Sequence, residues 1–130
     1  MAPTFTAVGL VVADMGKSLA FYRRLGLDIP SSSDDAPHAE AVVPGGGKVM
    51  WDTYETVRSF DPDFVPPGGE GGISLAFACA DPAEVDSTHA ALVAAGHRSH
   101  LEPWDAPWGQ RYAVVLDPDG NGVDLFAPLT

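Results

Sequence analysis

The side chains best suited to metal chemistry are two histidines, each followed two positions later by a glutamate. His38 precedes Glu40, and His100 precedes Glu102. On a strand, an i, i+2 spacing places both side chains of a pair on one face. Imidazole and carboxylate groups are common ligands of divalent metals. One hypothesis is therefore a metal site formed by these four residues. Against it, the two pairs do not occupy equivalent places in the internal repeat described below.

Two aspartates suggest a second kind of chemistry. Asp52 and Asp124 each lie in a segment with strand character, and a carboxylate pair facing one ligand can serve as general acid and base. Carboxylates in binding sites more often form hydrogen bonds to a ligand or to the backbone, so we favour a binding role. His38 has three possible roles: a general base, a flat stacking surface, or a surface residue.

The segment 104–112, with the sequence WDAPWGQRY, is the densest group of side chains suited to ligand binding. Trp104, Trp108 and Tyr112 offer flat apolar faces that also carry a polar group, and Arg111 adds a cation. Neighbouring prolines and a glycine shape the backbone around them. This composition is typical of a binding-site wall. The alternative is a set of ordinary core aromatics at the start of a hairpin.

Composition limits the class of protein. A chain of 130 residues fits one domain. Asp and Glu outnumber Lys and Arg by 18 to 7, and the net charge of −11 disfavours nucleic acid and anionic membranes as partners. The single cysteine, Cys79, excludes an internal disulfide. We recognise no secretory signal, membrane-spanning run, nucleophile elbow or phosphate-binding glycine motif. A soluble, cytoplasmic protein is expected.

The first half of the chain predicts a strand, an amphipathic helix, a loop and two further strands. Asp14 is a suitable N-cap for the helix and Gly26 a suitable end. The polar segment 30–37 predicts a mobile loop. The order is β-α-β-β, or β-α-β-β-β if residues 27–29 pair. The predicted strands cover residues 4–12, 39–43 and 48–53, and glycines 45–47 form the turn between the last two.

The second half repeats this pattern after a linker rich in proline and glycine at residues 58–72. Asp81, Pro82 and Glu84 are typical of a helix start, and Val85, Leu92 and Ala95 are the predicted inward side chains. The predicted strands cover residues 73–79, 98–101, 111–116 and 123–127.

Residues 7–14 align with residues 74–81 without a gap, which indicates an internal duplication. The predicted units are about 1–57 and about 73–130, within one domain. Duplicated units of this kind favour an α+β fold in which paired sheets share a concave surface.

Two segments, residues 11–22 (VVADMGKSLAFY) and 117–121 (DPDGN), resemble the vicinal oxygen chelate superfamily of glyoxalases, bleomycin resistance proteins and dioxygenases. The resemblance covers nearly the whole chain. It implies two tandem βαβββ units that form paired, curved mixed sheets around a concave pocket. Further segments resemble the mitomycin-binding resistance proteins of this superfamily: 36–38, 51–53, 55–59, 103–104, 108–113 and 123–128.

The enzymes of this superfamily hold a divalent metal through His or Glu on the first and last strands of each unit. The first-strand positions correspond here to Ala7 and Ser74, which are not competent metal ligands. On the last strands, Asp124 is a carboxylate, and its counterpart in the first unit falls at Met50 or Trp51. The resemblance therefore implies a protein without a metal or other cofactor.

The resemblance implies that the chain binds a planar, hydrophobic natural product of the mitomycin or bleomycin type and sequesters it without turnover. Trp108 and His38 would stack on the ligand, and Tyr54 is a further candidate. A homodimer is expected, as is common in the superfamily. The alternatives are a metal-dependent lyase, isomerase or dioxygenase, and a binder of an endogenous metabolite. The remaining expected contacts are an apolar wall of Trp51, Trp104 and Tyr112 and polar anchors from Asp52, Arg111 and Asp124.

Overall fold

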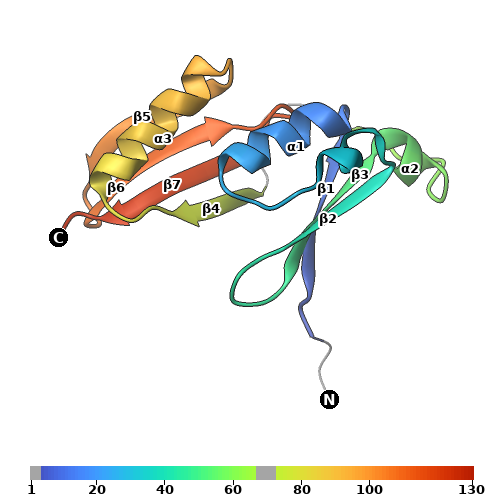
Figure 1. The fold of residues 1–130 in the computed structure, drawn as a ribbon, viewed down its shortest axis with the longest axis horizontal. Coiled ribbons are helices and arrows are strands. Elements are labelled where there is room, and N and C mark those ends of the chain that lie inside the picture. The colour runs from blue at the N-terminus through green and yellow to red at the C-terminus, as the bar shows by residue number, and fades with distance from the viewer. Residues whose placement is uncertain (1–3, 67–72) are drawn as a thin grey trace. The chain divides into compact units, whose positions relative to one another are not determined.

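The computed structural model describes residues 4–66 and 73–130, so residues 67–72 of the predicted linker lie outside the described residues. The chain divides into unit 1, residues 1–68, and unit 2, residues 69–130 (Figure 1). None of the helices in the described ranges is long and apolar enough to cross a membrane. The elements, in chain order, are β1 (Ala7–Val12), α1 (Met15–Arg24), the 3-10 helix η1 (Ser31–Asp35), β2 (His38–Val42), β3 (Lys48–Thr53), α2 (Tyr54–Arg58), β4 (Ser74–Ala78), α3 (Pro82–Ala94), β5 (Arg98–Ala106), β6 (Gln110–Leu116) and β7 (Gly122–Pro128).

Unit 1 contains a three-stranded mixed sheet in the order β1-β3-β2. β1 runs parallel to β3, and β2 pairs with β3 as an antiparallel hairpin. Gly45, Gly46 and Gly47 all have positive φ in the hairpin turn, as their sequence predicts. Residues 27–29 form no strand. Of the two predicted orders, β-α-β-β is therefore the correct one for the strands and first helix of this unit. The Arg23 side chain donates hydrogen bonds of 2.7 Å to the carbonyls of Ile29 and Pro30.

The core of unit 1 lies between α1 and one face of the sheet. The Asp14 side chain caps α1 by accepting from the Lys17 N–H at 3.0 Å, which confirms the predicted helix start. Tyr22 and Trp51 are fully buried, and their rings meet edge to face at 5.6 Å. The predicted loop at 30–37 contains η1, which is joined to α1 by a 2.8 Å ion pair between Arg23 and Asp34.

The opposite face of the unit 1 sheet, called here the open face of unit 1, carries most of its polar side chains. Strand register places His38 beside Asp52, and Glu40 beside Met50. Because side chains alternate between faces along a strand, these residues lie on the face away from Val49 and Trp51. The residues of the open face are Ala7, Gly9, Val11, His38, Glu40, Val42, Lys48, Met50 and Asp52.

Unit 2 contains a four-stranded mixed sheet in the order β4-β7-β6-β5, with α3 along one face (Figure 1). Asp81 caps α3, and its side chain accepts from the Glu84 N–H at 2.8 Å. The predicted inward residue Ala95 is exposed, and His89 is buried instead, with its Nε2 2.7 Å from Ser99 Oγ. The buried side chains of this core are Val85, His89, Leu92, Ala113, Val115, Val123, Leu125 and Ala127.

The strand predicted at residues 98–101 is longer than the sequence indicates. β5 continues through Pro103 to Ala106, so the segment 104–112 forms the tip and arms of the β5–β6 hairpin. Gly109 turns the chain with a φ of 91°, a backbone conformation that favours glycine. Together the two mixed sheets and few helices confirm the predicted α+β fold class, with three strands in unit 1 and four in unit 2.

Candidate functional site

The three aromatic residues of the β5–β6 hairpin form one cluster, called here the aromatic cluster. The ring centroids of Trp104 and Trp108 are 5.7 Å apart, and those of Trp108 and Tyr112 are 5.3 Å apart, both edge to face. Trp108 is 57% exposed and Trp104 is 39% exposed. The Trp108 indole N–H donates a 2.9 Å hydrogen bond to Gln110 Oε1. The cluster therefore presents aromatic rings to solvent in a fixed arrangement.

A carboxylate lies beside this cluster on the same face of the sheet. Register pairs Tyr112 with Phe126 and Val114 with Asp124, so Tyr112 and Asp124 are diagonal neighbours away from α3. Burial, with a hydrogen bond to the Asp124 carboxylate, raises the pKa of the Tyr112 hydroxyl. Tyr112 therefore stays a neutral donor at physiological pH, and the structure brings two predicted site residues together here.

Arg111 points away from the aromatic cluster. Its neighbours Tyr112 and Gln110 face one side of the sheet, whereas Arg111 lies on the side covered by α3. Its guanidinium donates to Asp86 on α3 at 2.8 Å and to Asp105 at 3.1 Å, and these partners raise its pKa further. Arg111 thus links α3 to the hairpin rather than lying with the other predicted anchors.

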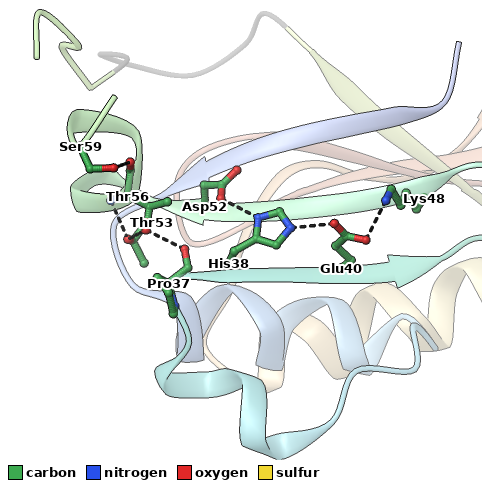
Figure 2. A network of polar contacts seen from close by, with 8 residues as sticks. All are labelled: Pro37, His38, Glu40, Lys48, Asp52, Thr53, Thr56 and Ser59. Atoms are coloured by element: carbon green, nitrogen blue, oxygen red, sulfur yellow. Dashed lines mark hydrogen bonds and ion pairs between the residues drawn. The ribbon is translucent and has the colours of Figure 1, made fainter. Parts of the chain in front are cut away.

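The predicted polar residues of unit 1 form a chain of contacts on its open face (Figure 2). His38 Nδ1 lies 2.6 Å from Asp52 Oδ1, and His38 Nε2 lies 2.7 Å from Glu40 Oε2. Lys48 Nζ lies 2.8 Å from the other Glu40 oxygen. Both ring nitrogens of His38 face carboxylates, which only accept hydrogen bonds when ionised. The arrangement therefore favours the doubly protonated imidazolium.

Electrostatics agree with this geometry. The hydrogen bonds to Glu40 and Asp52 raise the pKa of His38 above its ordinary value of 6.5. Hydrogen bonds from Lys48 and His38 lower the pKa of Glu40. A histidine with both nitrogens protonated has no free lone pair, so it is not a metal ligand or a general base in this state. It presents instead a flat, cationic ring.

We expect an NMR titration to place the pKa of His38 above 6.5. Because the folded pKa is raised, protonated His38 stabilises the fold below the unfolded value, and this contribution is lost as pH rises through the folded pKa. Glu40→Gln should lower the His38 pKa, whereas Glu102→Gln in unit 2 should leave it unchanged. A His38 pKa at or below 6.5 would contradict the paired imidazolium.

Trp51 lies in the core of unit 1, where its side chain has no exposed surface. Among the described residues, its indole nitrogen has no hydrogen-bond partner. The structure thus gives Trp51 a packing role, in contrast to the predicted ligand-facing wall.

Tyr54 is partly exposed at the start of α2, and its ring centroid lies 5.7 Å from that of Phe64.

Strand register identifies the residues at the metal-ligand positions that the resemblance implies. Ala76, which aligns with Gly9, pairs with Asp124, and Gly9 itself pairs with Met50. Met50 is therefore the counterpart of Asp124 in unit 1, on the open face. Within residues 4–66 and 73–130, no group of three or more His, Cys, Asp or Glu side chains is suited to hold a metal. The four residues of the alternative metal site belong to different units, His38 and Glu40 to unit 1 and His100 and Glu102 to unit 2.

Sequence reasoning did not identify a cavity of about 600 Å³ in unit 1. Its charged lining residues are Asp35, Glu55 and Arg58. The segment 55–59 contributes to the resemblance described above, but nothing in its pattern marks these side chains as lining one cavity. Only the fold reveals this cavity, because it brings the end of η1 close to α2.

Comparisons with known proteins agree with the fold. A model of the family "Glyoxalase/Bleomycin resistance protein/Dioxygenase superfamily" matches residues 4–125. A superfamily member from Sphaerobacter thermophilus is 29% identical, with 97% of this chain and 98% of that chain covered and a TM-score of 0.66. A glyoxalase/bleomycin resistance protein/dioxygenase from Nocardioides is 26% identical, with 99% and 85% covered and a TM-score of 0.75.

A third structure, a glyoxalase/bleomycin resistance protein/dioxygenase family enzyme from Burkholderia phytofirmans, is 21% identical, with 95% of this chain and 98% of that chain covered and a TM-score of 0.81. At that identity the likeness shows the fold alone. No curated protein matches the sequence. Because the family match spans nearly the whole length, the chain belongs to the glyoxalase/bleomycin resistance protein/dioxygenase superfamily.

Proposed function

We propose that this protein binds a planar, hydrophobic natural product of the mitomycin or bleomycin type and sequesters it without turnover, so that it protects against the compound. The observation that carries the proposal is the exposed aromatic cluster of Trp104, Trp108 and Tyr112. A ligand ring on Trp108 gains apolar contact and favourable aromatic geometry. Such flat, partly polar side chains typically dominate binding energy.

Polar groups within each unit support recognition of a substituted ring. Asp124 lies next to Tyr112 and offers a carboxylate to ligand donors. The Glu40 and Asp52 carboxylates beside the flat His38 ring favour its protonated form, and a cation over a ring face is attractive. The resemblance to mitomycin-binding resistance proteins supports His38 as a second stacking surface. Assembly as a homodimer stays a prediction.

Binding without a metal is supported by the residues at the four implied ligand positions. Ala7, Met50 and Ser74 replace the expected His or Glu side chains, and one carboxylate at Asp124 does not hold a divalent ion tightly. The rival function is a metal-dependent lyase, isomerase or dioxygenase of the same fold. It requires a metal-binding arrangement that these residues do not supply.

Titration of the protein with mitomycin C, bleomycin and a quinoxaline intercalator tests the proposed function. Quenching of tryptophan fluorescence should saturate at one ligand for each chain, because Trp108 is exposed and lies at the centre of the aromatic cluster. A nonplanar compound of similar size serves as the control and should cause no saturable change. If only endogenous metabolites bind, the antibiotic assignment is wrong although the binding surface is correct.

A further inference from the structure

The cavity in unit 1 is suited to a small polar molecule. It lies where β1 and β3 end and α2 begins, and its lining includes Ala13 after β1, Asp35 at the end of η1, and Glu55 and Arg58 on α2. Its volume of about 600 Å³ is within the range of small-molecule sites. All of its described lining residues belong to unit 1, and the proposed function assigns them no role.

Hydrogen bonds within the lining fix the positions of its walls. The Thr53 N–H donates to the Pro37 carbonyl at 3.2 Å, and the Thr56 hydroxyl donates to the same carbonyl at 2.8 Å (Figure 2). The Thr53 hydroxyl lies 2.8 Å from that of Thr56, and the Ser59 hydroxyl donates to the Thr56 carbonyl at 2.6 Å. These contacts join the segment before β2 to α2 and already use the hydroxyl donors of the lining. The charged side chains are therefore the groups that can recognise a ligand.

Two aromatic rings hold the guanidinium of Arg58. Its Cζ is 5.8 Å from the ring centroid of Tyr54 and 5.9 Å from that of Phe64. Such contacts stabilise the cation and leave its N–H groups able to donate hydrogen bonds. Glu55 lies one helical turn earlier on α2, yet within residues 4–66 and 73–130 the Arg58 side chain forms no hydrogen bond or ion pair.

The carboxylates of Asp35 and Glu55 also stay unpaired in the part of the chain that the structure describes. Asp35 belongs to η1 and Glu55 to α2, so the two carboxylates come from different elements of the lining. Together with Arg58 they give the cavity acceptors and a donor of opposite charge that do not neutralise one another.

This combination of charges limits the ligand that fits. A molecule with only negative charge meets the carboxylates of Asp35 and Glu55, and a molecule with only positive charge meets Arg58. A molecule with one ammonium group and one carboxylate satisfies both, because carboxylates accept hydrogen bonds from an ammonium group and guanidinium donates to a carboxylate. Hydrogen bonds between charged groups are also roughly twice as strong as those between neutral groups. The α-amino acids have this pattern.

We propose that the unit 1 cavity binds a free α-amino acid, with its carboxylate on Arg58 and its ammonium group on Glu55 or Asp35. Residues three apart on a helix have Cβ atoms about 5–6 Å apart, so Glu55 and Arg58 are spaced for two groups attached to the same carbon atom. The apolar surface of Ala13 and Ala36 in the lining is then available to the amino-acid side chain. This site goes beyond the proposed function and does not depend on it.

Titration of the isotope-labelled full chain with glycine and with L-phenylalanine, followed by NMR, tests the proposal. Amide signals in the segments 35–37 and 53–59, which line the cavity, should shift and saturate. N-acetyl-L-phenylalanine lacks the ammonium group, and L-phenylalaninamide lacks the carboxylate. Each should bind roughly tenfold more weakly than L-phenylalanine, as expected for loss of a hydrogen bond between charged groups.

Two variants assign the two ends of the ligand. Arg58→Met keeps an unbranched side chain beside the aromatic rings but removes the donors, so it should bind the amide at least as tightly as L-phenylalanine and still discriminate against the N-acetyl compound. Asp35→Asn combined with Glu55→Gln should show the reverse pattern. General damage to the fold would weaken all three compounds alike. Arg24→Met, which removes an exposed arginine outside the cavity, should preserve both preferences.

Several results would overturn the amino-acid site. They are the absence of saturable shifts with both glycine and L-phenylalanine, shifts confined to residues outside the lining, equal binding of the three phenylalanine compounds by wild type, and a full preference for L-phenylalanine over its amide in Arg58→Met. If Arg58→Met does not fold by circular dichroism, the carboxylate variant decides, and undiminished discrimination against the N-acetyl compound contradicts the proposal. None of these results changes the outcome expected for mitomycin C, so the two proposals fail separately.

Discussion

Trp108→Ala should reduce ligand affinity by at least about thirtyfold, because loss of an aromatic residue at a binding hot spot costs about 2 kcal/mol or more. Trp108 is the middle ring of the aromatic cluster and contacts both Trp104 and Tyr112. Its removal thus deletes the exposed ring and loosens its two neighbours. Because the side chain is 57% exposed, the fold should remain intact. Fluorescence from the remaining tryptophans, or calorimetry, measures the affinity.

Two control variants test whether the loss of affinity is specific to the aromatic ring of Trp108. Trp108→Phe keeps an aromatic face but lacks the indole N–H that donates to Gln110, so its affinity should fall less than that of the alanine variant. Phe60→Ala removes an aromatic side chain that is also largely exposed but is not one of the proposed site residues, and affinity should be unchanged. If Trp108→Ala binds every ligand as tightly as wild type, the aromatic cluster is structural and the site assignment is wrong.

Trp51→Ala should destabilise the protein by about 3–5 kcal/mol, the usual cost of truncating a large buried aromatic. Trp51 has no exposed surface, and its ring packs edge to face on Tyr22, so the substitution leaves a cavity between α1 and β3. At roughly 2–8 °C for each kcal/mol, the melting temperature should fall by at least about 6 °C. Chemical denaturation followed by circular dichroism measures the change in free energy of unfolding.

Trp51→Phe is the matched control for this prediction. The indole nitrogen of Trp51 has no hydrogen-bond partner among the described residues, so replacement by phenylalanine removes only part of the packing. The loss of stability should therefore be smaller than in Trp51→Ala. A Trp51→Ala protein with wild-type stability and reduced ligand affinity would instead support the ligand-facing role that the sequence suggests. The Trp51 and Trp108 variants together separate packing from binding.

Local signals made much of the fold predictable. The caps at Asp14 and Asp81 and the glycine turn at 45–47 depend on hydrogen bonds and φ values within a few residues. The length of β5 was not predictable in this way, because Pro103 is expected to end a strand. β5 is the edge of its sheet, where a proline is tolerated, and the register shift between Leu101 and Trp104 accommodates it. At 27–29 no strand forms, and the Arg23 side chain donates hydrogen bonds to the carbonyls of Ile29 and Pro30.

The candidate site was predictable where neighbouring residues determine it. Trp108 and Tyr112 meet because a tight hairpin brings its two arms together. The opposite orientation of Arg111 follows from strand alternation and is readable from the sequence once β6 is recognised. The face on which Trp51 lies cannot be read from the sequence in this way. Apolar residues stand on both sides of the sheet, at Val49 and Met50, and only the position of α1 decides which face is core. The carboxylate partners of His38 depend on strand register.

Recovery of ligand after saturation, in the presence of a metal chelator, tests the central claim most directly. Protein treated with EDTA and mixed with mitomycin C should bind one ligand for each chain with unchanged affinity, because neither the aromatic cluster nor His38 with its partners Glu40 and Asp52 needs a metal. Chromatography and mass spectrometry should return the ligand chemically unaltered after long incubation with excess compound. Binding that disappears with EDTA and returns with a divalent metal, or a product that accumulates beyond one equivalent, would contradict metal-free sequestration.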